Sequence, residues 1–259
     1  MATYNKRGYK PEKPEVEKEE NAHQAVLNDH SETKEVFSSL DSSANKIGNW
    51  FTLNQSKVFY AIGALAVAAV GYFVYDNFIL EPKEDLAAND IFQSRLYYGE
   101  AVNNTAGSSD SLFNLVLKGG EGKMGVLSII EEYPGTDVEN EAHYLAGVTY
   151  LNTGKFKEAI QHLEQYNSKD LFTKAMSLGA IGDAFSELNQ PEQAFEFYKK
   201  ASEHTPNDFS TPRYAYKAGL MAIELGKKDE ALKLFTNIKD NYKSSVEAAN
   251  IDVYLGMAQ

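Results

Sequence analysis

The stretch Leu178–Pro206, LGAIGDAFSELNQPEQAFEFYKKASEHTP, decides the fold of most of this chain. Gly182 lies three residues before Phe185, and Ala194 lies four residues before Tyr198, so each small residue shares a helical face with an aromatic one. Asn189, between them, is a residue type that ends helices. Small residues let two helices approach closely while aromatic residues fill the gaps between them. The stretch therefore predicts a hairpin of two packed helices.

The same pattern recurs on both sides of this stretch, at spacings of 35 and 37 residues. The preceding copy consists of Ala146, Gly147, Tyr150, Gly154, Ala159 and Leu163, and the following copy consists of Ala218, Gly219, Gly226, Ala231 and Phe235. Three copies at a nearly constant period indicate a stack of helical hairpins.

The pattern resembles the tetratricopeptide repeat, in which W-x2-L-G-x2-Y precedes A-x3-F and then Ala and Pro. The middle copy meets this motif with Leu178, Ile181, Gly182, Phe185, Ala194, Tyr198, Ala201 and Pro206. The outer copies depart from it, because Tyr166 and Ile238 replace Ala, Ala222 replaces Tyr, and the closing Pro is missing. The resemblance implies a solenoid that binds other proteins.

Two flanking segments extend the predicted stack. Glu131–Thr136 resembles the end of an earlier, degenerate repeat whose first helix covers residues 86–102. Lys123–Tyr133 is predicted to be helical, and Pro82 is expected to interrupt the helix that precedes residue 86. Ala248–Gln259 resembles the terminal helix with which a solenoid is capped.

The uncharged run Val58–Tyr75, VFYAIGALAVAAVGYFVY, predicts a membrane anchor at residues 58–80. At about 1.5 Å per residue its 18 residues cover about 27 Å, close to the hydrocarbon thickness of a bilayer. Aromatic residues crowd both ends, as at membrane interfaces: Trp50, Phe51, Phe59, Tyr60, Tyr72, Phe73, Tyr75 and Phe78. A buried core helix is the alternative, although such a helix seldom lacks a polar face. The 57 preceding residues argue against a cleavable signal peptide.

Two different segments precede the anchor. Residues 1–30 carry interleaved charges of both signs and two prolines, which predicts a disordered tail. Residues 31–57 form an amphipathic juxtamembrane segment, in which Phe37, Leu40, Ala44, Ile47 and Phe51 share one helical face. An interfacial helix, a pairing seam for a partner helix and a simple lead-in to the span all fit this pattern.

Charge limits the partners and the orientation. The formal net charge is −12, and residues 1–57 hold eight Lys/Arg and nine Asp/Glu, so most of the acidic excess lies beyond them. Such an acidic body is not expected to bind nucleic acid. Lys46 and Lys57 before the span balance Lys83 and Arg95 after it. The remaining basic residues of the tail favour a cytoplasmic N-terminus, with the repeats across the membrane.

The complete layout is similar to that of the YfgM-like ancillary subunits of the bacterial SecYEG translocon. The resemblance extends into the span region through Trp50, Phe51, Asn54, Lys57, Gly63, Gly71 and Tyr75, whereas the Lys-, Glu- and Pro-rich tail is longer than expected for that family. It implies a single-pass protein of the inner membrane, with a cytoplasmic tail at residues 1–30 and a periplasmic repeat domain at residues 81–259.

The same resemblance implies the partners: translocon subunits, a periplasmic chaperone and exported polypeptides, whose export or folding the protein would assist as a chaperone-like adaptor. A structural scaffold subunit of another cell-envelope complex is the alternative, because repeat solenoids serve many partners.

In such solenoids five positions of each first helix line a concave groove, so the resemblance implies a partner-binding groove. Its residues are Glu141, Tyr144, Val148 and Asn152, then Met176, Asp183 and Glu187, then Arg213, Tyr216 and Leu220, with Leu151, Gly179, Ser186, Ile223 and Glu224 at the remaining positions. Aromatic residues supply contact area and polar groups set the register of a bound peptide. A groove closed by the chain itself, for example by residues 112–118, is the alternative.

Catalysis is not predicted. The phosphate-binding motif GxxxxGK[ST] is absent, because Met124 follows Gly122-Lys123. No two of the five histidines, His23, His30, His143, His162 and His204, lie four residues apart with an acidic partner, so they predict no metal site. The absence of cysteine excludes disulfides and thiolate chemistry. The sequence thus predicts an all-α protein with a single transmembrane helix followed by a tetratricopeptide-repeat solenoid, not an enzyme, with no cofactor and no small-molecule substrate.

Overall fold

We describe the fold from a computed structural model, in which residues 32–104, 109–168 and 170–259 are placed. The predicted tail at residues 1–30 lies outside the described residues. The chain divides into two compact units, one ending at Gly71 and one covering Tyr72–Gln259. The regular elements of the described part are helices, apart from two strands of two residues each, which confirms the all-α prediction.

The first unit contains α2 (Glu32–Leu53) and most of α3 (Gln55–Tyr75). No residue of α3 is buried, and its large apolar side chains are exposed along its whole length. One helix of the described residues, the run Gln55–Asn103, is long and apolar enough to cross a membrane. The predicted anchor is therefore present as a candidate membrane span.

Pro82 does not interrupt the chain as expected. It lies in the first turn of α4 (Glu81–Asn103), directly after a π-helical turn, η1 (Asp76–Leu80). A proline has no backbone N–H to donate to the preceding turn, and a wider turn lets a helix accommodate that loss without ending. Helical structure consequently runs through the position where we predicted a break.

The segment between α4 and the first repeat differs from the single helix pair that was predicted. It contains α5 (Asp110–Lys118), the strands β1 (Gly119–Gly120) and β2 (Lys123–Met124), and α6 (Val126–Glu132). The prediction of a helix from Lys123 was wrong, because Lys123 and Met124 pair with β1 and the helix begins at Val126. Glu121, Gly119 and Gly122 adopt positive φ in this hairpin, a backbone conformation that a helix cannot include.

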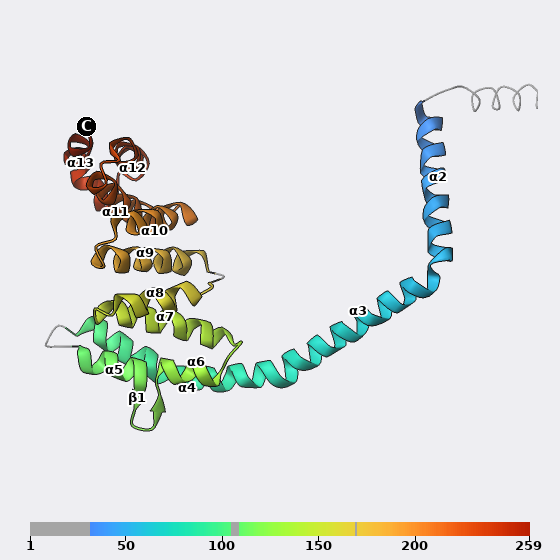
Figure 1. The fold of residues 1–259 in the computed structure, drawn as a ribbon, viewed down its shortest axis with the longest axis horizontal. Helices are drawn as coiled ribbons and strands as arrows, with labels where there is room; N and C mark the ends of the chain where they lie inside the picture. The colour runs from blue at the N-terminus through green and yellow to red at the C-terminus, as the bar shows by residue number, and fades with distance from the viewer. Residues whose placement is uncertain (1–31, 105–108, 169) are drawn as a thin grey trace, which may run out of the picture. The chain divides into compact units, whose positions relative to one another are not determined.

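Three helical hairpins follow, stacked one on the next (Figure 1). They are α7 (Asp137–Asn152) with α8 (Phe156–Gln165), α9 (Leu171–Glu187) with α10 (Pro191–His204), and α11 (Ser210–Glu224) with α12 (Lys228–Asn241). In each hairpin a glycine of the first helix faces a large side chain of the second: Gly147 faces Leu163, Gly182 faces Tyr198 and Gly219 faces Phe235. A Cβ atom at any of these glycines would collide with the facing side chain, which confirms the predicted close contacts.

The turn inside each hairpin also repeats. Gly154, Asn189 and Gly226 adopt positive φ at equivalent positions. The backbone N–H of the next residue then donates to a carbonyl of the preceding helix, for example from Gln190 to Phe185 at 2.9 Å and from Lys227 to Ala222 at 2.8 Å. These bonds satisfy carbonyl groups that a helix end leaves without partners.

The C-terminal segment forms η2 (Glu247–Asn250) and α13 (Ile251–Ala258), which pack against α11 and α12. Ile251 and Ala258 join the buried cluster of the last two hairpins. The predicted capping helix is thus confirmed.

Candidate functional site

The first helices of the three hairpins carry the predicted groove residues. Two hollows lie along these helices. The first-repeat hollow, about 460 Å³, is lined by Asp137, Asn140, Glu141, Tyr144, Leu145, Tyr166, Asn167, Ser168, Asp170 and Thr173. The third-repeat hollow, about 480 Å³, is lined by Arg213, Tyr216, Lys217, Leu220, Val246, Glu247, Asn250 and Tyr254. Half of the ten principal groove residues therefore line a hollow.

Glu141 in the first-repeat hollow is paired within the chain. The guanidinium of Arg95, on α4, donates from Nε to Oε1 of Glu141 at 2.6 Å and from Nη2 to Oε2 at 2.5 Å. This bidentate pair raises the pKa of Arg95 and fixes the orientation of both side chains. Glu141 therefore presents a neutralised, directed carboxylate and not an isolated charge.

Tyr144 is the aromatic wall of the same hollow. Its ring centroid lies 5.0 Å from that of Tyr166, and burial raises the pKa of Tyr144 to about 12. The hydroxyl therefore stays protonated at neutral pH and can act as a hydrogen-bond donor to a bound segment. Tyr166, which replaces the alanine of the motif, lines the same hollow beside Tyr144.

Asp183, in the middle of the stack, is bound by two neighbours. It accepts a hydrogen bond from the hydroxyl of Tyr198 at 2.6 Å and from Nζ of Lys217 at 2.5 Å. Burial, together with this carboxylate, raises the pKa of Tyr198 well above its usual value. Because Lys217 belongs to the third hairpin, Asp183 links the second repeat to the third.

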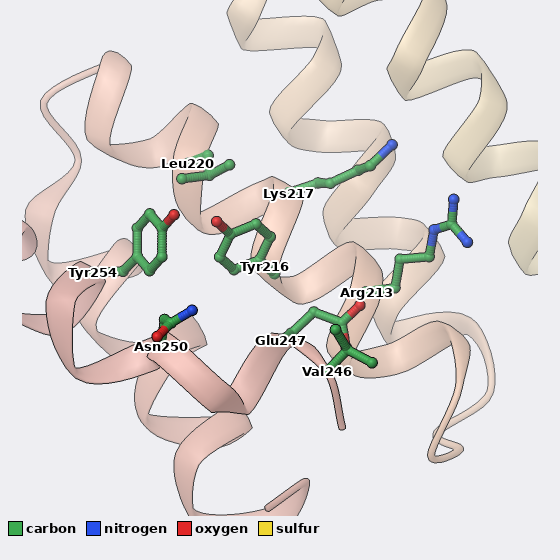
Figure 2. Close-up of a pocket in the computed structure, with 8 residues that line it drawn as sticks. All are labelled: Arg213, Tyr216, Lys217, Leu220, Val246, Glu247, Asn250 and Tyr254. Atoms are coloured by element: carbon green, nitrogen blue, oxygen red, sulfur yellow. The ribbon is translucent and has the colours of Figure 1, made fainter. Parts of the chain in front are cut away.

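The third-repeat hollow lies between α11 and the C-terminal segment (Figure 2). The rings of Tyr216 and Tyr254 meet edge to face at a centroid distance of 4.9 Å, and Figure 2 shows them next to each other. Burial and the hydrogen bond with Tyr254 raise the pKa of Tyr216 to about 12. Arg213 is exposed and Leu220 is half-buried, so this hollow offers a cationic, an aromatic and an aliphatic side chain together.

The side chains of the remaining predicted groove residues differ in their exposure to solvent. Val148 is buried against Leu163 and Ile181 and does not display its side chain. The amide of Asn152 is exposed but donates to the carbonyl of Val148 at 2.7 Å. Met176 is half-buried and Glu187 is exposed. Gly179 is covered by the ring of Tyr214, which leaves no room for a side chain there.

The alternative of a groove covered by residues 112–118 does not match the structure. That run forms part of α5 and contributes Val116 and Leu117 to a buried cluster with α4, α6 and α7. The segment that faces the predicted groove comes from the other end of the chain, through Val246, Glu247, Asn250 and Tyr254. It narrows the groove at the third repeat without filling it.

Sequence reasoning missed several residues of the site. Nothing in the sequence indicated that Arg95 belongs to the site, because its partner Glu141 lies 46 positions further along the chain. Lys217 follows Tyr216 in sequence, and Tyr254 lies in the predicted capping helix. Neither position indicated a role in the groove, because only the packing of the helices brings these side chains to it.

Two histidines that appear separate in sequence meet in the first hairpin. Nδ1 of His143, on α7, lies 3.1 Å from Nδ1 of His162, on α8, so one ring donates to the other. Burial lowers the pKa of both. In the described part of the chain no group of three or more metal-ligating residues gathers.

Comparison with known families identifies the repeats. Tetratricopeptide repeat models match residues 141–168, 175–208 and 214–245. These three ranges coincide with the three hairpins, so the predicted tetratricopeptide repeats are confirmed. No curated protein matches the chain. The chain thus carries a protein-binding repeat domain of a typically non-catalytic kind, and the resemblance to YfgM-like subunits stays a prediction.

Proposed function

We propose that this protein is a membrane-anchored adaptor that holds a protein-binding groove at the inner membrane, facing the periplasm, beside the SecYEG translocon. The observation that carries the proposal is that the repeat body and the candidate span share one helical run, Gln55–Asn103. Within the second unit α4 is fixed to the repeats, since Nζ of Lys83 donates to the carbonyl of Pro134 at 2.9 Å and Glu84 accepts from the N–H groups of Asp137 and Val138. These bonds hold the helix that follows the span against the repeats within the second unit, which supports a repeat body that receives partners near the membrane.

The groove supports a protein partner in an extended or helical form. Tyr144 and Tyr216 offer aromatic area near its two ends, Arg213 offers a bidentate donor, and Met176 and Leu220 offer adaptable apolar contact. The proposed partners are translocon subunits, a periplasmic chaperone and exported polypeptides, as the sequence resemblance implies.

Substitution of the groove tests the binding site. Tyr144→Ala, Arg213→Ala and Tyr216→Ala should each weaken partner capture by about 1 to 3 kcal/mol, because large or bidentate side chains dominate interfaces. Helicity measured by circular dichroism should stay unchanged. Glu192→Ala, an exposed change on α10 outside the predicted groove, serves as the control. Unaltered capture by the triple variant would place binding outside the groove.

Purification of the full chain in mild detergent, with identification of the proteins that accompany it, tests the partners. Translocon subunits together with exported chains are expected, and their recovery should fall in the triple variant. A fixed set of other envelope proteins would support the alternative, a structural scaffold subunit. That alternative is favoured by the internal pairing of Glu141 and Asp183, since groove charges engaged within the chain leave fewer for a client.

A further inference from the structure

Exposed apolar side chains on the repeats occur at one kind of position. Among the residues described between 134 and 246, the large apolar side chains that are exposed are Leu171, Phe172, Phe209 and Val246. All four lie in or directly beside the connections that lead out of one hairpin, after α8, α10 and α12. The turns within hairpins, at residues 153–155, 188–190 and 225–227, expose only Gly, Lys and Asn.

The connections between hairpins form one continuous edge of the stack, which we call the inter-hairpin edge. Helices alternate in direction, so every connection of this kind lies at the same end of the helices (Figure 1). Asn140 exchanges hydrogen bonds of 3.0 and 2.7 Å with the backbone of Asn167. The ring centroids of Phe172 and Phe209 lie 5.5 Å apart, so the connections after α8 and α10 are in contact.

The inter-hairpin edge begins at the end of the candidate span. A hollow of about 620 Å³ is lined by Tyr72, Asp76, Asn77, Leu80, Glu81, Glu84, Asp85, Gly135 and Asp137. Gly135 belongs to the connection that precedes the first hairpin and Asp137 begins α7, so this connection lies beside the residues that follow the span. All of these residues belong to the second unit. Tyr72, Tyr75 and Phe78 are exposed there, and such rings favour the headgroup region of a bilayer.

We propose that the inter-hairpin edge rests on the surface of the bilayer that the span crosses, with Leu171, Phe172, Phe209 and Val246 at the boundary between headgroups and acyl chains. The proposal builds on the membrane anchoring proposed above. The aromatic residues Tyr72, Tyr75 and Phe78 at the end of the span lie near the start of this edge and support lipid as its occupant. Apolar side chains flanked by polar loop residues are typical of surfaces that enter the interface without crossing it.

The carboxylate next to the exposed pair Leu171 and Phe172 is engaged within the chain. The carboxylate of Asp170 accepts from the N–H of Thr173 at 2.7 Å and caps α9, and this bond lowers the pKa of Asp170. A carboxylate engaged in this way can stay at the level of the hydrated headgroups while the neighbouring Leu171 and Phe172 enter more deeply.

Because the chain contains no cysteine, single cysteines can report depth in the full-length protein. Phe209→Cys and Val246→Cys place an environment-sensitive fluorophore on the edge. Lys155→Cys and Lys228→Cys place it at exposed positions of the opposite edge, and Phe78→Cys places it at the end of the span. Each variant is reconstituted in phosphatidylcholine vesicles that carry a lipid-attached nitroxide quencher. We expect severalfold stronger quenching at residues 209 and 246 than at 155 and 228.

The outcomes separate the two proposals. Quenching at residue 78 with equal, weak quenching at 209, 246, 155 and 228 would overturn the edge contact, whether a protein or a second copy of the chain covers the edge, and leave the anchor standing. Absence of quenching at residue 78 would overturn the anchor and the edge contact together. In the Val246→Cys protein, adding Leu171→Ser and Phe172→Ser should lower quenching toward the level at residue 155, and an unchanged signal would show that these side chains do not hold the edge in the interface.

Discussion

Gly147, Gly182 and Gly219 each face a large side chain 16 positions later, on the second helix of the same hairpin. The facing side chain changes from Leu163 to Tyr198 to Phe235, whereas the glycine does not change. The stack thus depends on the absence of a side chain at one position per repeat. Ala159, Ala194 and Ala231, all fully buried, provide the second small residue of each hairpin.

Gly182→Leu and Ala194→Leu should therefore destabilise the middle hairpin by about 1 to 3 kcal/mol or more, because the added volume has no space beside Tyr198. Glu192→Leu, an exposed change in the same hairpin, is the control and should have little effect. Thermal unfolding of the detergent-purified chain, followed by circular dichroism, measures the difference. Equal melting temperatures for the three variants would contradict the assigned repeat register.

The pair His143 and His162 makes the first hairpin sensitive to acid. Burial lowers the pKa of each ring below its usual 6.5, and His143 lowers that of His162 further, while the carboxylate of Glu139, 3.9 Å from Nε2 of His143, partly opposes the shift. Histidines of the unfolded chain take up protons near pH 6.5, whereas His143 and His162 of the folded chain take up protons only at a lower pH. The unfolded state then binds more protons, so stability is complete above about pH 6.5 and falls as the pH drops toward the folded pKa values.

We expect a lower melting temperature at about pH 5.5 than at about pH 7.5, and a smaller difference in His162→Gln, which keeps a polar side chain but removes one titrating ring. His204→Gln, in the exposed part of the second hairpin, is the control and should behave like the unchanged chain. A pH dependence that persists fully in His162→Gln would assign the acid sensitivity to other groups.

At the scale of elements, α13 both covers the end of the repeat stack and lines the third-repeat hollow. Tyr254 contacts Tyr216 at 4.9 Å and Phe235 at 5.7 Å between ring centroids, so the same ring closes the core of the last hairpin and bounds the third-repeat hollow. Stability and the shape of the candidate site are therefore coupled at this helix.

Tyr254→Ala should destabilise the last hairpin by about 1 to 2 kcal/mol through the loss of two aromatic contacts and their buried area. The change should also make the chain easier to cleave by protease near residues 243–246, because η2 and α13 lose their main aromatic contact. Val253→Ala, at an exposed neighbouring position, should change neither property. Identical protease patterns for the two variants would show that Tyr254 does not hold the cap.

At the scale of the whole molecule, the orientation in the membrane follows from the proposed function. Protease added to spheroplasts should remove the repeat body, residues 81–259, and leave a short membrane-protected fragment that contains residues 1–57. Digestion of the N-terminal segment with an intact repeat body would reverse the orientation. A tag at either terminus, detected by immunoblot, distinguishes the two results.

The repeats could be predicted from the sequence because their decisive contacts are local. Gly182 and Tyr198 identify a hairpin without reference to the rest of the chain, and the same spacing occurs three times. The candidate site was less accessible to prediction. Arg95 reaches Glu141 from a helix outside the matched repeats, and Tyr254 reaches Tyr216 from the cap, so both depend on how distant segments pack. The pairing of Lys123 and Met124 with Gly119 and Gly120 was missed for a different reason, because helical propensity does not account for the backbone conformation of the tight turn between them.

The constant and short sequence separation between each glycine and its facing side chain also affects how the chain folds. Contacts of short sequence separation form quickly and need no distant partner. Each hairpin can close once its own residues are available, so the repeats can form one after another in the order of synthesis. The third-repeat hollow is different, because Val246, Glu247, Asn250 and Tyr254 belong to the last segment of the described chain. A chain still being made can therefore fold its first hairpins, with the first-repeat hollow and the Arg95–Glu141 pair, before the third-repeat hollow exists.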